Sequence, residues 1–182
     1  MKFQETGIEG LTVVSLKPFR DERGYFERIY CGRNMTEAGF EISIVQINHS
    51  FNRLKGTMRG LHYQYGPHKE VKIVRCVAGR VLDYCVDLRK YSPTFLKVFA
   101  IELTEELHNA LIIPKGFAHG FLTLDDDSHL LYLHSEYYTA GYESGLNFRD
   151  PRLNIKLPFT PTVQSARDND FPFINDEFQG II

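Results

Sequence analysis

The stretch MRGLHYQ, residues 58–64, places a single imidazole, His62, three residues after Arg59. Histidine changes its charge close to neutral pH, so His62 could transfer protons, and its neutral ring could also bind a metal ion. A third interpretation is a buried histidine that only packs. The heptapeptide leaves all three open, and the choice depends on the partners that the rest of the chain brings to this ring.

A histidine that acts as a general base needs a carboxylate that orients its ring and stabilises the imidazolium. Spacing does not choose among the candidate aspartates, which are Asp83, Asp87, Asp150 and Asp168. Removing a proton from carbon also requires a cation where enolate charge develops and an acid that returns the proton. Lys72 and Tyr132 carry suitable side chains for these two roles. Their structural alternatives are a lysine at a sheet edge and a core tyrosine.

Two segments carry histidines at spacings that resemble the motifs of the cupin superfamily. The segment PKGFAHGF has the spacing P-x-G-x-x-H up to His119, and Gly56 stands six residues before His62. Metal-binding cupins generally combine an H-x-H pair and a glutamate with a histidine from the second motif. Here Gln64 replaces the second histidine of the pair, and Glu70 lies slightly too far along the chain. The residues therefore favour proton transfer without a metal or other cofactor.

Strands must position these side chains, because short runs of alternating apolar and polar residues dominate the chain. Residues 71–88, VKIVRCVAGRVLDYCVDL, contain two such runs and predict an antiparallel hairpin with Gly79 at its turn. Further predicted strands, spaced as in sandwiches and barrels, cover residues 94–103, 109–114 and 129–138. The predicted fold class is therefore all-β, a cupin-type jelly-roll barrel with a few short helices.

Helical signals are confined to short segments. Residues 34–40, NMTEAGF, predict one helix with Asn34 or Thr36 near its cap, and residues 104–107, TEEL, predict another turn. Strand alternation places Lys72 on the same face as apolar residues, so we expect it to point into the barrel. A jelly roll can hold a ligand at its mouth, which makes inward-pointing polar residues the candidates for chemistry.

Length and composition describe one globular domain spanning residues 1–182. The net charge of −2, from 21 basic and 23 acidic residues, gives no electrostatic footprint for nucleic acid. The N-terminal segment MKFQETGIEG lacks an apolar export signal, and no apolar run reaches membrane-spanning length. The three cysteines have no C-x-x-C spacing and are expected to be reduced thiols. We therefore expect a cytoplasmic protein without a membrane segment.

Blocks along nearly the whole chain resemble the dTDP-4-dehydrorhamnose 3,5-epimerase family. In order they are FRDERGYFER, VQINHS, KGTMRGLHYQ, EVKIVRCVAGRVLDYCVDLRKYSPT, IPKGFAHGF, YLHSEYY, RDPRLNIKLP and QSARD. The resemblance implies an isomerase of deoxysugar biosynthesis, of the rhamnose, O-antigen and lipopolysaccharide type. Its substrate would be a dTDP-linked 4-keto-6-deoxyhexose, inverted at C3 and C5 through an enolate. A ketone at C4 acidifies the protons at both carbons, so one base and one opposing acid suffice.

The resemblance also implies roles for individual residues. His62 and Asp168 would form the basic dyad. Lys72 would lie beside the enolate oxygen, and Tyr132 would be the acid. The residues implied in substrate binding are Arg23, Phe26, Glu27, Gln46, Asn48, Arg59 and His119, with Asp83 in a supporting position. Phe26 and Glu27 resemble the pair that meets the nucleotide base, commonly across the interface of a homodimer.

The chain departs from the family pattern in two places. Leu133 follows the tyrosine where many members have a lysine, and NFRDP, with Phe148 and Arg149, replaces a WNDP-like block. These differences leave open whether C3 alone or both carbons are inverted, and whether the sugar carries dTDP or CDP. Two alternatives of other classes are a non-catalytic sugar-nucleotide binder and a metal-dependent cupin.

Overall fold

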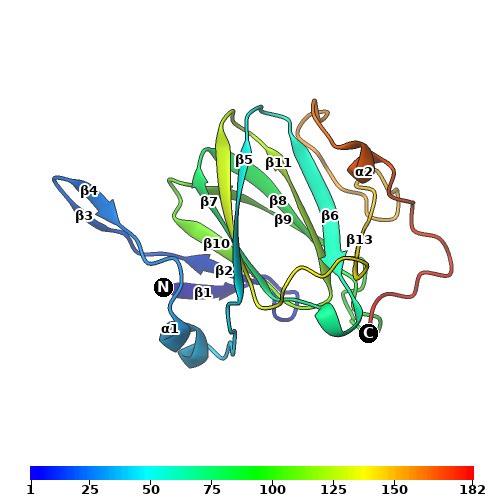
Figure 1. Ribbon diagram of the computed structural model, residues 1–182, viewed down its shortest axis with the longest axis horizontal. Coiled ribbons are helices and arrows are strands. Elements are labelled where there is room, and N and C mark those ends of the chain that lie inside the picture. Colours follow the sequence, from blue (N-terminus) through cyan, green and yellow to red (C-terminus); the bar gives the residue numbers. More distant parts are fainter.

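The computed structural model describes residues 1–182 and is built from two antiparallel sheets with a separate two-stranded ribbon (Figure 1). The larger sheet has the order β1-β2-β10-β7-β12-β5, the smaller has the order β13-β6-β11-β8-β9, and β3 pairs with β4. The strands are β1 Lys2–Glu5, β2 Thr12–Ser15, β3 Phe19–Asp21, β4 Gly24–Phe26, β5 Gln46–Asn52, β6 Met58–Gln64, β7 Lys72–Ala78, β8 Arg80–Asp87, β9 Val98–Thr104, β10 Asn109–Ile113, β11 Phe117–Thr123, β12 Ser128–His134 and β13 Glu143–Gly145. The predicted all-β jelly-roll class is confirmed.

One predicted connection is wrong. The two runs within residues 71–88 are strands, but they do not form a hairpin, because β7 pairs with β10 and β12 while β8 pairs with β9 and β11. The chain crosses from one sheet to the other at Gly79, whose φ is 72°. A Cβ at this position would come within 2.6 Å of the Ser128 hydroxyl oxygen. A glycine at a corner between sheets therefore produces the same sequence pattern as a hairpin turn.

The helices are short. They are α1 Gly32–Glu37, α2 Ala166–Asn169 and the 3₁₀ turn η1 Gly66–His68. α1 overlaps the predicted helix, but its N-cap is Cys31, which makes no side-chain cap bond, so neither predicted cap is correct. Residues 105–108 form a turn, which overlaps the turn predicted at residues 104–107, and α2 was not predicted. No helix has the length and apolar character needed to cross a membrane.

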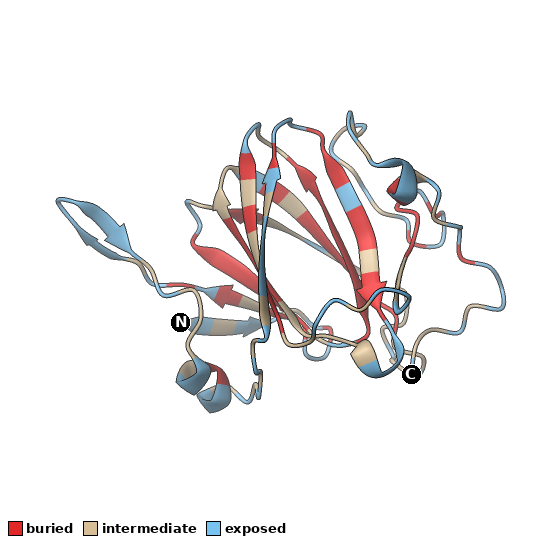
Figure 2. Cartoon of the chain, viewed as in Figure 1, coloured by how far each residue is buried: buried red, intermediate tan, exposed pale blue.

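Apolar side chains form three buried clusters. The first fills the space between the sheets and includes Val74 and Phe121, and the second covers the outer side of the smaller sheet with C-terminal residues such as Leu153 and Ile174. The third includes Met35 of α1 and the outer side of the larger sheet. Figure 2 shows this burial concentrated on the paired strands. The strands are thus held from both sides, which gives the side chains between them fixed directions.

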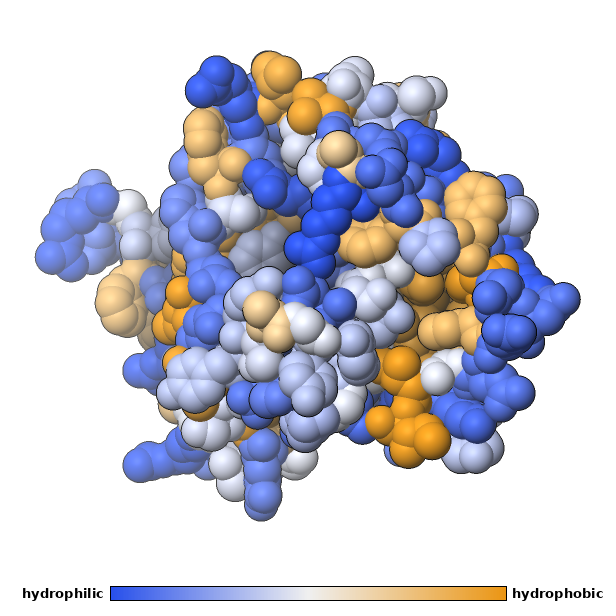
Figure 3. Space-filling view, turned by 45° about the vertical axis from the view of Figure 1, so that its right-hand side comes forward, coloured by the Kyte–Doolittle hydropathy of each residue, from blue (hydrophilic) through white to orange (hydrophobic).

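The ribbon of β3 and β4 projects away from the sheets (Figure 1). All of its residues are exposed, including the large side chain of Phe19. On the face drawn in Figure 3, polar side chains dominate and apolar groups are small and separate, while the ribbon extends to one side. Cys76 and Cys85 are buried free thiols and Cys31 is partly buried, as expected for reduced cysteines.

Candidate active site

His62 lines three adjoining hollows, of about 540, 290 and 390 Å³. It comes from β6 in the smaller sheet, where its cross-strand partners are His119 of β11 and Gly145 of β13. Lys72 and Tyr132 come from β7 and β12 in the larger sheet and line the 290 Å³ hollow with it. The base candidate and the two other proton-handling candidates therefore lie on opposite walls of one cavity.

A buried aspartate holds the His62 ring. Asp168 Oδ1 lies 2.7 Å from His62 Nε2, and Asp168 Oδ2 accepts a hydrogen bond of 3.0 Å from the Gly60 backbone N–H. Burial raises the pKa of the Asp168 carboxyl, but the hydrogen bonds from His62 and Gly60 outweigh it, so the pKa is lowered overall. The carboxylate is therefore ionised and accepts the Nε2 proton, and in the neutral ring this arrangement leaves the lone pair on Nδ1.

Helix α2 sets the position of this aspartate. The Ser165 side chain caps the helix by accepting a 3.1 Å hydrogen bond from the Asp168 backbone N–H. The ring of Phe171 packs edge-on against His62, with ring centroids 5.7 Å apart. Because the helix turns immediately after its cap, the carboxylate points back onto β6. The structure thus brings together residues separated by 106 positions in the chain.

Lys72 and Tyr132 point into the space between the sheets, and for Lys72 the alternation of β7 predicts this direction. Lys72 Nζ forms an ion pair of 3.0 Å with Glu70 Oε1. Burial raises the pKa of Tyr132, which keeps its hydroxyl protonated at neutral pH so that it can act as an acid. Its ring meets that of His119 edge-on, at 6.1 Å. The cavity therefore contains an imidazole, a lysine ammonium and a protonated tyrosine hydroxyl.

His119 forms a second histidine–aspartate pair beside the first. Its Nε2 lies 2.8 Å from Asp83 Oδ2, and the Asp83 side chain is fully buried. Burial raises the pKa of Asp83, against the opposing effects of the charge and hydrogen bond of His119. His119 lines the 290 Å³ hollow, whereas the unexposed Asp83 does not and lies behind it.

Three further residues of the predicted substrate-binding set line the cavities: Gln46, Asn48 and Arg59. The Arg59 Nε donates a 2.6 Å hydrogen bond to Asn52 Oδ1, which leaves the far end of its guanidinium available to a ligand. Gln46 Oε1 accepts a hydrogen bond from the Tyr138 backbone N–H. The amide side chains therefore have positions set by neighbouring strands and loops.

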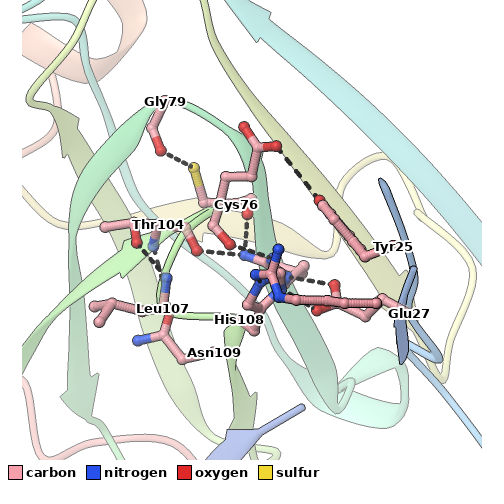
Figure 4. Close-up of polar contacts among 11 residues, drawn as sticks. Tyr25, Glu27, Cys76, Gly79, Thr104, Leu107, His108 and Asn109 are labelled. Atoms are coloured by element: carbon pink, nitrogen blue, oxygen red, sulfur yellow. Dashed lines mark hydrogen bonds and ion pairs between the residues drawn. The ribbon is translucent and has the colours of Figure 1, made fainter. Parts of the chain in front are cut away.

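The remaining three members of that set do not line the cavities of this chain. Arg23 and Phe26 are exposed on the ribbon, and Arg23 pairs with a neighbouring aspartate of the ribbon. Glu27 is buried, with one carboxylate oxygen 3.2 Å from Arg75 Nε and the other 2.5 Å from His108 Nδ1. Figure 4 shows this network at the base of the ribbon. Both oxygens of Glu27 are engaged within the chain, because the buried Arg75 requires a counter-charge, and a contact of Glu27 with the nucleotide base across a dimer interface stays a prediction.

The structure adds lining residues that the sequence analysis did not name for a substrate site. They are Tyr63, Gln64, Glu70, His134, Tyr138, Glu143 and Arg167 in the largest hollow. Only Arg167 could have been suggested from the sequence, because it directly precedes Asp168 in the QSARD block. Gln64 binds backbone groups of residues 68, 137 and 139. The possible metal ligands of the cupin motifs, His62, Glu70 and His119, do not form a metal site, because no three His, Cys, Asp or Glu side chains are suitably arranged.

A base on one wall and an acid on the other are what an enzyme needs when it moves a proton from one face of a carbon atom to the opposite face. The fold that carries them is a cupin-type barrel, so fold and site together define an acid–base isomerase. The chain belongs to the family described as dTDP-4-dehydrorhamnose 3,5-epimerase, whose model matches residues 5–176.

Known relatives cover nearly the whole chain. The dTDP-4-dehydrorhamnose 3,5-epimerase of Shigella flexneri is 38% identical over 180 residues, which are 98% of this chain and 99% of the relative. The crystal structure of the Legionella pneumophila dTDP-6-deoxy-D-glucose-3,5-epimerase in complex with dTDP-4-keto-L-rhamnose has a TM-score of 0.90 and 34% identity, covering 94% of this chain and 92% of that one. A 3′-monoepimerase of Streptomyces bikiniensis in complex with dTDP-quinovose has a TM-score of 0.86 and 32% identity, covering 92% and 85%.

Proposed function

We propose that this chain epimerises a dTDP-linked 4-keto-6-deoxyhexose at C3, C5 or both, with His62 as base and Tyr132 as acid. The observation that carries this proposal is the ionised Asp168 at 2.7 Å from His62, on a cavity wall opposite Lys72 and Tyr132. A sugar ring held between the walls would present one face to each group.

Each inverted carbon needs two proton transfers and no change of oxidation state, after which the imidazolium of His62 releases its proton to solvent and the Tyr132 oxygen takes one up. His62 Nδ1 takes the proton from the carbon beside the C4 ketone, and the electron pair of the C–H bond moves through the new C–C double bond to the ketone oxygen. The Lys72 ammonium stabilises the negative charge on that oxygen. Tyr132 then protonates the carbon from the opposite face as the ketone re-forms. Acid–base catalysis of this kind contributes about 10²–10⁴-fold, so positioning and enolate stabilisation supply the rest.

The nucleotide diphosphate would bind along the rim of the cavity. Arg59 lines two of the hollows, and a guanidinium suits phosphate because its planar donors match two oxygens. The exposed Arg23 and Phe26 are available to a second copy of the chain, and the projecting ribbon supports a homodimer whose ribbons complete each other's sites. Light scattering should therefore give twice the chain mass.

The test is incubation with dTDP-4-keto-6-deoxyglucose in D₂O, followed by NMR. We expect deuterium at C3, C5 or both, together with the inverted product. Absence of exchange with both the dTDP-linked and the CDP-linked sugar would refute the proposal. Binding of the nucleotide sugar without exchange would instead identify a non-catalytic binder, and loss of activity on chelation, with stoichiometric metal on the purified protein, would identify a metal-dependent cupin.

Inversion at C3 alone is the second candidate, because the similar proteins include a 3′-monoepimerase as well as 3,5-epimerases. Deuterium at C3 only would identify it, and competition between dTDP and CDP would identify the nucleotide.

We also propose that the protein acts in deoxysugar biosynthesis in the cytoplasm. Its free thiols suit that reducing compartment.

A further inference from the structure

A buried carboxylate–histidine pair lies directly beside Lys72. Glu70 precedes β7, and its two carboxylate oxygens have different partners: Oε1 is 3.0 Å from Lys72 Nζ, and Oε2 is 2.6 Å from His134 Nδ1. His134 is the last residue of β12 and the cross-strand partner of Lys72. The Glu70 side chain is only 8% exposed and that of His134 11% exposed. The geometry joins the end of one strand and the start of its neighbour through a single carboxylate.

The charges and protons of this pair follow from its contacts. Burial raises the pKa of the Glu70 carboxyl, but the hydrogen bond from His134 and the charge of Lys72 outweigh it, so the pKa is lowered and Glu70 is ionised. An ionised carboxylate accepts the Nδ1 proton of His134. His134 Nε2 is then free to accept the 3.3 Å hydrogen bond from the Asn48 side-chain amide. Each polar atom of the pair therefore has a partner within the protein, and both residues line the 540 Å³ hollow beside Lys72.

A lysine that stabilises an enolate needs such support. Its ammonium sits on a flexible four-carbon stem, and holding a catalytic group in place is worth a large part of a rate enhancement. One of its three N–H donors is directed at Glu70, which leaves two for a ligand. The charged and titratable groups that share these cavities with it are His49, Arg59, His62, Tyr63, Glu70, His119, Tyr132, His134, Tyr138, Glu143 and Arg167. Of all these groups, only Glu70 lies within ion-pair distance of the ammonium.

The arrangement resembles that of the His62–Asp168 pair on the opposite wall of the cavity. There Asp168 gives one oxygen to the catalytic histidine and the other to a backbone N–H. Here Glu70 gives one oxygen to the lysine and the other to His134. In both cases a second donor fixes the carboxylate, so the carboxylate can fix the reacting group.

We propose that Glu70 and His134 are positioning residues for Lys72, which hold its ammonium where the enolate oxygen forms. This inference rests on the proposed function, because it assigns Lys72 to that oxygen. Glu70 acts on the reaction only through Lys72, and His134 acts only through Glu70. The effect of replacing Glu70 should therefore disappear when Lys72 is absent.

A double-mutant cycle tests this dependence. Glu70→Gln should lower kcat about 10- to 100-fold with KM changed less than about threefold, because positioning is lost while the substrate still binds. In a Lys72→Met background, Glu70→Gln should lower kcat no further. An equal loss in both backgrounds, a change in KM alone, or a rise in kcat would overturn the proposal.

The His134 variants provide an independent test if the Glu70 variant fails to fold. Asn carries an amide N–H close to the position of His134 Nδ1, so His134→Asn should keep most of the activity, while His134→Leu should match Glu70→Gln. Equal activity of the Asn and Leu variants would overturn the role of His134. Glu102→Gln is the matched control, since this carboxylate pairs with Arg80 at 3.4 Å, outside the cavities. Wild-type protein that catalyses no exchange would refute the proposed function, whereas active wild type with additive variants refutes only this inference.

Discussion

Replacing Asp168 with asparagine should disable His62 by changing which ring nitrogen carries the proton. In the wild-type structure Asp168 accepts hydrogen bonds from His62 Nε2 and from the Gly60 N–H. An asparagine has a single acceptor oxygen, which Gly60 would retain, so the amide N–H₂ would face His62. The ring would then have to accept at Nε2 and carry its proton on Nδ1, the atom that must take the proton from carbon.

The size of the effect follows from two losses. Two unit charges about 4 Å apart attract by about 4 kcal/mol at an effective dielectric constant of about 20. The His62 side chain is 41% exposed, and screening there reduces the stabilisation of the imidazolium to about 2 kcal/mol. Keeping the reactive tautomer against two facing donors costs about 1–3 kcal/mol more. The total of about 3–5 kcal/mol corresponds to a loss of roughly 10²- to 10⁴-fold in kcat/KM.

The assay is deuterium incorporation into the 4-keto sugar in D₂O, followed by NMR at equal protein concentration. Asp170→Asn is the matched control, because Asp170 is exposed at the end of the same helix and should behave as wild type. Thermal unfolding of both variants establishes that they are folded. A folded Asp168→Asn variant with a rate within threefold of wild type would refute the assignment of His62 and Asp168 as the basic dyad.

Three further changes have distinct expected results. Tyr132→Phe should lower formation of the inverted product about 10²–10⁴-fold while exchange at the carbon facing His62 continues, because only the returning acid is lost; NMR that shows both falling equally would contradict this role. Arg59→Lys should raise KM about tenfold with a smaller change in kcat, since lysine lacks the planar donor fork, and steady-state kinetics with unchanged KM would contradict a phosphate contact. Hydrogen bonds from Arg89, Ser92 and Thr94 outweigh burial and lower the pKa of Asp87 from 3.8 to about 2. Asp87→Asn should therefore cost about 2 kcal/mol of unfolding free energy at pH 7. This difference should be complete above about pH 4 and vanish as the pH falls to about 2, and urea unfolding that shows a difference independent of pH would contradict it.

The pattern of apolar and polar residues was sufficient to predict which way a side chain points within a single strand. The alternation along β7 predicts that Lys72 faces the barrel interior, and the structure has it lining the cavity with His62. The same pattern fails at Gly79, because a positive φ serves both a hairpin turn and a corner between sheets. Alternation describes which side of a strand is buried but does not identify the neighbouring strand.

The residue pattern did not determine which residues of the site contact one another. Four aspartates suited His62 on chemical grounds, and only the family resemblance selected Asp168, which α2 places against the ring. The contacts of Glu27 with the buried Arg75 and His108 are likewise ones that the sequence pattern did not indicate. A buried arginine needs a paired charge, and Glu27 supplies it for Arg75.

The sequence by itself determined the chemistry that is available and the class of the fold: a histidine, a lysine and a tyrosine on strands of an all-β chain. Only the tertiary structure decided which groups meet, because the contacts of the site join residues 106 positions apart, as in His62 and Asp168, or 64 apart, as in Glu70 and His134. Hydrogen bonds and ion pairs act over about 3 Å, so they depend on strand register and helix position rather than on neighbours in the chain. The facing sheets bring His62, from one sheet, and Lys72 and Tyr132, from the other, to opposite sides of one cavity.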